Sequence, residues 1–137
     1  MSFLFDTNVI SELRKGKACD RNVARWHRGV TEDEIYMSVL VLGEIRKGAE
    51  KIRRRDPMRA RAIEDWMVAL SVALGDRVLP VTAEIADVWG RMSTLRTVPI
   101  IDSLLAATAK GHGLTIVTRN VSDFVEFDIA VLNPFAP

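Results

Sequence analysis

Short, continuous apolar runs alternate with longer segments of helical pattern, and this alternation constrains the fold more than any other feature of the chain. The apolar runs lie at residues 2–5, 34–38, 77–81, 114–118 and 129–134. Strands that are apolar on both faces and separated by helices are typical of a parallel sheet covered on both sides. The sequence therefore predicts a three-layer α/β/α sandwich around a parallel sheet of about five strands.

Helix start and stop signals lie between these runs. Asp20, Ser38 and Thr82 are placed to cap helices, and the pair Asp56–Pro57 is a strong helix start. The predicted helices cover residues 8–16, 20–29, 39–54, 56–74, a segment after residue 82, and 98–113. Because no linker, repeat or low-complexity tract interrupts the pattern, we expect a single domain over residues 1–137.

Cysteine content and hydropathy indicate a compartment. Cys19 is the one cysteine of the sequence, so no disulfide can form within the chain. That composition is typical of a reducing, intracellular environment. The N-terminus lacks the basic region and cleavage site of a signal peptide, and no apolar run approaches membrane-spanning length. We expect a cytoplasmic protein with no membrane partner.

Four acidic residues occupy unusual settings. Asp6 follows the first apolar run directly, and Asp123 lies just after the run at 114–118. Glu44 interrupts an apolar helical turn, and Asp102 begins a helix rich in leucine and alanine. In parallel sheets the ligand site lies beyond the carboxyl ends of the strands. The pattern therefore predicts that these four carboxylates meet at one edge of the sheet.

Each acid also has a simple structural explanation. Asp6 and Asp102 are placed to cap the helices that follow them, and Asp123 is placed as an ordinary turn residue. Glu44 could pair with the basic residues at 46–47 on its own helix. The joint pattern is harder to explain in this way, since four acids are attached to the same predicted edge and two of them break apolar runs.

Crowded carboxylates indicate a metal ion. Such groups repel one another, and a divalent cation removes that penalty. Oxygen ligands without cysteine or histidine favour Mg²⁺ or Mn²⁺, and the chemistry they support best is phosphodiester hydrolysis. The sequence contains no Ser-His-Asp, GxxxxGK[ST] or GxGxxG motif. Polar residues near the acids are candidates for orienting ligands or binding phosphate, or are only caps and turns: Thr7, Asn8, Ser38, Thr118 and Asn120.

Two glycines flank Glu44 along its helix. Gly43 and Gly48 weaken a helix, so we expect them to mark a close approach of another backbone.

The sequence resembles PIN-domain ribonucleases, specifically the VapC-type toxins of toxin–antitoxin pairs. The resemblance rests on FLFDTNVISEL at 3–13, LVLGEIRKGAE at 40–50, PIIDSLLAATAKGHGLTIVTRNVSDF at 99–124 and VLNPF at 131–135. It implies a PIN-like fold and a Mg²⁺- or Mn²⁺-dependent endoribonuclease. The acids around the metal would be Asp6, Glu44, Asp102 and Asp123. One departure is Ser103, where family members often have alanine.

The resemblance also implies partners. These are an RNA substrate, a second copy of the chain in a homodimer, and a cognate antitoxin that blocks the site. Promoter DNA would be bound only through the antitoxin complex.

A basic segment follows Glu44. Residues 46–61 hold eight Lys or Arg against two acids, which gives the segment a net charge of +6 in a chain of total charge +1. This segment is predicted to lead RNA towards the metal, to dock the antitoxin, or to be only a solvated helix face.

Two other functions fit parts of the pattern. A PIN-like module could hold RNA or a partner without cutting, although the complete set of acids argues against it. A phosphatase or receiver-like protein would need a second aspartate close to Asp6 or a suitably placed lysine, and position 8 is Asn.

Overall fold

A parallel sheet forms the centre of the molecule. The computed structural model describes residues 1–92 and 99–137, and within them five strands pair in the order β3-β2-β1-β4-β5, every pair parallel. The strands are β1 (Phe3–Phe5), β2 (Ile35–Ser38), β3 (Val78–Leu79), β4 (Thr115–Val117) and β5 (Val131–Leu132). The predicted parallel sheet of about five strands is confirmed.

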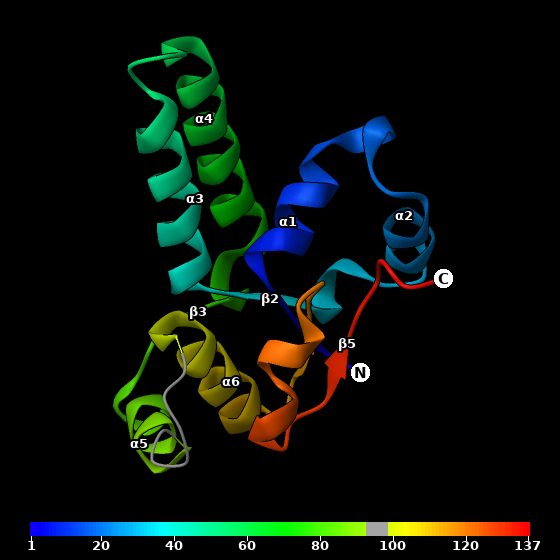
Figure 1. The fold of residues 1–137 in the computed structure, drawn as a ribbon, viewed down its shortest axis with the longest axis vertical. Helices are drawn as coiled ribbons and strands as arrows, with labels where there is room; N and C mark the ends of the chain where they lie inside the picture. The colour runs from blue at the N-terminus through cyan, green and yellow to red at the C-terminus, as the bar shows by residue number, and fades with distance from the viewer. Residues whose placement is uncertain (93–98) are drawn as a thin grey trace.

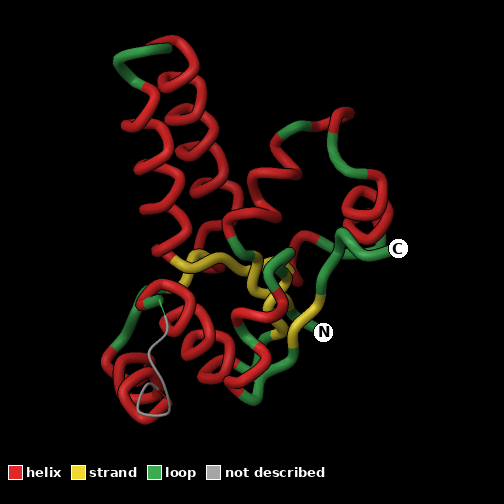
Figure 2. Tube along the Cα trace, in the orientation of Figure 1, coloured by secondary structure: helices red, strands yellow, loops and turns green. Residues whose placement is uncertain are grey.

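Helices cover the sheet on both sides. They are α1 (Thr7–Arg14), α2 (Arg21–Arg28), α3 (Val39–Ile52), α4 (Pro57–Leu74), α5 (Ala83–Met92) and α6 (Ile100–His112). Figure 1 shows α1, α2 and the long α3–α4 hairpin on one side and α5 and α6 on the other. Figure 2 shows the strands enclosed between these two helical layers. The arrangement matches the predicted sandwich, and Val98, the first residue of the helix predicted at 98–113, lies outside the described residues.

The predicted caps set the helix boundaries. Asp20 accepts from the backbone N–H groups of the first turn of α2, and Ser38 Oγ accepts from the N–H of residue 40 at 3.0 Å. Asp56 caps α4, and Thr82 Oγ1 accepts from the first turn of α5. Gly113 ends α6 in the left-handed region at φ +67°, which favours glycine.

The core lies along the central strand. All three residues of β1 are buried, because β1 has a neighbour on each side and helices on both faces. Phe5, Met37, Leu105 and Ile116 are almost completely buried around it. Each such side chain contributes about 1.5–3 kcal/mol through burial, so the end of β1 is firmly positioned.

No helix in the described part of the chain is both long enough and apolar enough to span a bilayer.

Candidate active site

Asp6 occupies the centre of the carboxyl edge of the sheet. It is the first residue after β1, and its N–H donates to the carbonyl of Val117 in β4 at 2.9 Å. The residue is only 8% exposed. A buried carboxylate is costly unless donors or cations compensate it, so its surroundings decide its role.

Hydrogen bonds hold the Asp6 carboxylate in one orientation. Oδ1 accepts from the N–H of Thr7 at 2.7 Å, and Oδ2 accepts from Thr118 Oγ1 at 2.9 Å. Asn8 Nδ2 lies 3.4 Å from Oδ2 and also donates to Thr118 Oγ1 at 3.2 Å. Thr118 Oγ1 in addition accepts from the N–H of Asn120 at 3.0 Å. Asp6 therefore caps α1, as one interpretation held, and is also fixed from β4.

Glu44 is tied to the same edge. The Oγ1 of Thr7, the residue after Asp6, donates to Glu44 Oε1 at 2.6 Å. This contact joins the start of α1 to the second turn of α3. No described residue forms an ion pair with Glu44, whereas Arg46 pairs with Glu50 and Glu64. The alternative that Glu44 pairs with residues 46–47 is wrong.

The other two acids come from the opposite side of Asp6. Asp102 is half-buried in the first turn of α6, whose N-cap is Pro99, and no side-chain cap bond forms there. The capping interpretation of Asp102 is therefore wrong. Asp123 is exposed and ends the 3₁₀ turn Val121–Asp123 that follows β4.

The four carboxylates lie near enough to one another for their charges to interact. Burial raises the pKa of Asp102 to about 6, with further contributions from the charges of Asp6, Asp123 and Glu44. Burial also raises the pKa of Asp6, against the hydrogen bonds from Thr118 and Thr7, and the charges of Glu44 and Asp123 raise it further. Acids from α1, α3, α6 and the segment after β4 therefore act on one another across a single site.

The donor set suits a hard divalent cation. All four groups offer carboxylate oxygens, and none forms an ion pair with any residue in the described ranges 1–92 and 99–137. In the conformation present, no three Asp, Glu, His or Cys side chains of those ranges gather closely enough to enclose an ion. The chemistry and mutual repulsion of the four acids fit Mg²⁺ or Mn²⁺, and binding would require their side chains to draw together.

The five polar residues predicted near the acids differ in what they contact. Thr7, Asn8 and Thr118 contact the acids directly. Ser38 is fully buried, and its hydroxyl accepts from the first turn of α3, so it acts as a cap. Asn120 contributes its backbone N–H to Thr118.

Part of the basic segment is already neutralised. Arg53 bonds to Glu50 at 2.7 Å and to Glu64 of the next helix, and Arg46 reaches Glu64 at 3.1 Å. These pairs tie α3 to α4. The net charge of residues 46–61 therefore overstates what the segment offers to a polyanion.

The expected close approach at the two glycines is wrong. A Cβ added at Gly43 or Gly48 would meet no atom within 4 Å. Both line hollows beside Glu44, so they leave open space around the acid.

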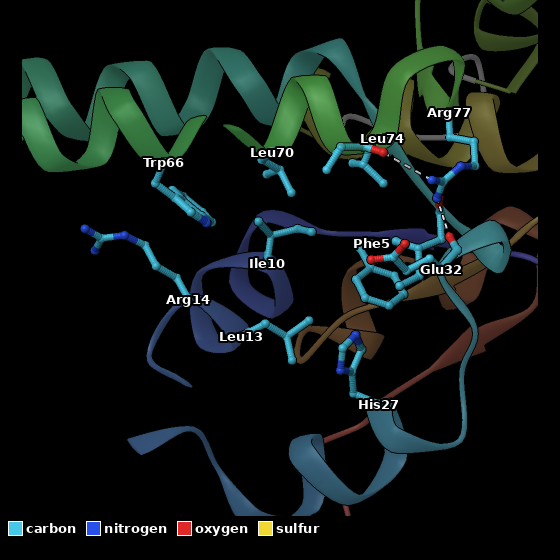
Figure 3. A pocket seen from close by; sticks show the side chains of 12 residues that line it. Phe5, Ile10, Leu13, Arg14, His27, Glu32, Trp66, Leu70, Leu74 and Arg77 are labelled. Carbon is cyan, nitrogen blue, oxygen red and sulfur yellow. Dashed lines mark hydrogen bonds between the residues drawn. The ribbon is translucent and has the colours of Figure 1, made fainter. Parts of the chain in front are cut away.

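A separate apolar cavity of about 230 Å³ lies between α1 and α4. Figure 3 shows Trp66, Leu70 and Leu74 on the α4 side and Ile10 and Leu13 opposite them. The guanidinium of Arg14 lies 5.4 Å from the centre of the Trp66 ring at one end. No local sequence motif indicates this cavity, because it exists only where two helices distant in sequence face each other.

Comparisons with known proteins identify the family of the chain. The PIN domain family matches residues 3–129. Toxin FitB of Neisseria gonorrhoeae is 29% identical, with 96% of this chain and 97% of the relative aligned. VapC ribonuclease Y4jK of Sinorhizobium fredii is 31% identical, with 98% of each chain aligned. The crystal structure of FitAcB from N. gonorrhoeae superimposes with a TM-score of 0.88 at 26% identity, covering 98% of this chain and 99% of the other.

Proposed function

The chain belongs to the PIN domain family, and from this premise we propose that it is a metal-dependent endoribonuclease, the toxin of a toxin–antitoxin pair. One observation carries the proposal. Asp6 is buried at the end of β1, and Thr7 bonds both to it and to Glu44. The charges of Asp102 and Asp123 act on the same site, and none of the four acids has an ion-paired cation among the described residues. Such a site is costly unless a bound cation compensates it.

Asp6, Glu44, Asp102 and Asp123 are the proposed ligands of Mg²⁺ or Mn²⁺. When bound, the ion would supply Lewis-acid activation of the scissile phosphate and of the attacking water. Thr118 and the N–H of Thr7 hold the Asp6 carboxylate, and the hydroxyl of Thr7 orients Glu44. Asn8 links the Asp6–Thr118 pair to the backbone N–H of Arg119. These bonds restrict the orientations of the Asp6 and Glu44 carboxylates before an ion arrives.

The proposed inhibitor is a cognate antitoxin. The solved FitAcB structure and the toxin names of the relatives support such a partner. The cavity between α1 and α4 offers the antitoxin an apolar docking surface, since Ile10, Leu13 and Leu70 line it. An occupant of this cavity would contact Arg14 and Trp66, which lie between the cavity and the acids.

Homodimer formation and promoter binding through the antitoxin complex remain part of the proposal, on the strength of the family resemblance. Sedimentation of the purified chain tests the dimer, and a promoter gel-shift with and without antitoxin tests the second point.

The test of the proposed function is cleavage of single-stranded RNA by the purified chain with Mg²⁺ and with EDTA. We expect cutting only with the metal ion, and Asp6→Asn or Asp102→Asn should lower the rate on the order of a hundredfold or more, because each removes a charged ligand. Asp87→Asn is the control, since Asp87 is an exposed residue that pairs with Arg91 on α5. Binding of RNA without Mg²⁺-dependent cutting would favour the non-catalytic module instead.

A further inference from the structure

A basic cleft leads away from Glu44 between three helices. Its volume is about 440 Å³, and Thr7 and Glu44 line it where it meets the acids. From there it runs between α1, α3 and α4 past Ile45 and Ile63 to Trp66. The cleft is therefore continuous with the candidate active site.

Positive charge dominates this cleft. Arg14 and Lys15 line it from the end of α1, and Arg59 lines it from the first turns of α4. Glu44 is the single acid among its described lining residues. A polyanionic substrate that approaches four carboxylates is repelled, so cations beside those carboxylates are needed to hold it there.

The three cations differ in how they are held. Arg14 stacks over the ring of Trp66, which restricts its guanidinium and reduces the entropy lost on binding an anion. Lys15 lies 3.0 Å from the buried carboxylate of Glu12. Arg59 forms no ion pair within the described part of the chain, so no acidic side chain there neutralises its charge. An anion in the cleft can therefore pair with it.

We propose that this cleft holds backbone phosphates of the RNA strand beside the scissile bond, with Arg59 and Arg14 as positioning residues. The inference rests on the proposed nuclease function and assigns part of its substrate path. Guanidinium groups bind phosphate through paired hydrogen bonds, so they position a phosphate more firmly than the ammonium group of a lysine would. The path differs from the whole basic segment 46–61, because Arg53 is paired with Glu50 and Glu64.

A second open space beside Glu44 is consistent with an RNA strand that continues past the acids. Glu44 also lines a space of about 310 Å³ on its other side, together with Leu40, Lys47 and Ile101. Glu44 thus lies between two open spaces, each of which carries a cation from the basic segment.

The experiment compares two arginines of one helix. Arg59→Gln removes a charge inside the cleft. Arg61→Gln removes the same charge outside it, from an exposed residue paired with Asp65 at 3.7 Å. Binding of a labelled single-stranded RNA of mixed sequence is measured over a range of salt, in the Asp6→Asn background so that the RNA stays intact. The kcat and KM are then measured with Mg²⁺ in the parent background.

We expect Arg59→Gln to weaken binding about five- to tenfold, the size of one lost charge-assisted contact. The slope of log affinity against log salt should fall by about 0.7, as for one phosphate contact to a single strand. KM should rise while kcat stays unchanged, because uniform binding is lost. Arg59→Lys should restore the salt slope but only part of the affinity, because it returns the charge without the paired hydrogen bonds, and Arg61→Gln should behave as the parent.

Equal RNA affinity and salt slope in Arg59→Gln and Arg61→Gln would overturn the proposal, as would a parent that binds no RNA. A loss of antitoxin binding alone in Arg59→Gln would also overturn it and assign the cleft to the protein partner. Failure of the nuclease function has a different signature, since the parent itself would then leave RNA uncut with Mg²⁺.

Discussion

At the scale of single residues, the site depends on acids that the fold keeps close despite their repulsion. Asp6 is oriented by Thr118 and by the N–H of Thr7, but these neutral donors compensate only part of its burial. Asp102 has no cap bond to a backbone group. The metal-free protein therefore carries an electrostatic penalty at neutral pH that protonation or a cation would relieve.

This penalty predicts a pH dependence of stability. The pKa of Asp102 rises to about 6 in the folded protein and that of Asp6 is also raised, so these two carboxyl groups bind more protons in the folded than in the unfolded state between about pH 4 and pH 6. Their contribution to stability in EDTA should fall as pH rises through this window, by roughly 1–2 kcal/mol for Asp102 after solvent screening. Urea denaturation at several pH values measures it. Asp102→Asn should flatten the profile, and a profile parallel to that of the parent would refute the coupling.

Two buried threonines provide a matched pair for the hydrogen-bond network. Thr118 Oγ1 bonds to Asp6, Asn8 and Asn120, whereas Thr108 Oγ1 donates only to the carbonyl of Leu104 in its own helix. We expect Thr118→Val to cost about 1–3 kcal/mol, because it leaves buried polar groups unsatisfied, and Thr108→Val to cost less than 1 kcal/mol. Urea denaturation of both variants measures the difference, and equal costs would argue against the network.

At the scale of helices and strands, the packing of α5 on α6 positions Asp102. Trp89 Nε1 of α5 donates to Ser103 Oγ at 2.9 Å, and that hydroxyl donates to the carbonyl of Ile100 at 2.8 Å. Ser103, the departure from the family pattern, thus links the two helices beside the acid. Gly111 continues the contact, since an added Cβ there would lie 2.5 Å from Ile85 Cδ1.

Alanine at two helical glycines should have opposite effects. Gly111→Ala would displace the end of the Ile85 side chain, which is 3% exposed. The gain in helix propensity offsets part of that cost, so we expect a net loss of about 0.5–2 kcal/mol. Gly43→Ala meets open space in α3, so the better helix former should stabilise the protein by about 0.5–1 kcal/mol. Chemical denaturation of the two variants decides the matter; stabilisation by Gly111→Ala would show that α5 and α6 pack less closely than described.

The sequence predicts local features of these elements well and contacts between distant elements poorly. The caps at Asp20, Ser38 and Asp56 were predictable because a cap depends on neighbours one to three residues away. The position of Asp6 was predictable because strand ends share one edge of a parallel sheet. The Arg53–Glu64 pair and the cleft at Arg59 were not predictable, since they require the packing of α4 against α1 and α3.

At the scale of the whole molecule, two neighbouring spaces along α1 and α4 are proposed to bind two different partners. The apolar cavity between them is assigned to the antitoxin, and the basic cleft that shares Arg14 and Trp66 with it is assigned to RNA. Antitoxin bound in the cavity would therefore cover one end of the RNA path, which provides inhibition without direct contact with the acids.

Charge placed in the apolar cavity should release the toxin from its inhibitor. Leu70→Glu puts a carboxylate among apolar lining residues, whereas Val72→Glu lies on an exposed part of α4 and is 78% exposed as valine. We expect Leu70→Glu to weaken antitoxin binding at least tenfold, because a charged side chain replaces an apolar contact, and Val72→Glu to have no effect. Calorimetric titration with antitoxin measures both, after denaturation has shown that the variants fold. Unchanged binding of Leu70→Glu would exclude this surface.

Mn²⁺ titration followed by EPR measures whether the four distant carboxylates together bind one divalent cation. We expect saturable Mn²⁺ binding by the parent chain and by the surface control Glu84→Gln. Binding should be at least tenfold weaker in each of the four variants Asp6→Asn, Glu44→Gln, Asp102→Asn and Asp123→Asn, because each removes one oxygen ligand and its charge. Parent-like Mn²⁺ affinity in all four variants would show that these carboxylates do not form a cation site.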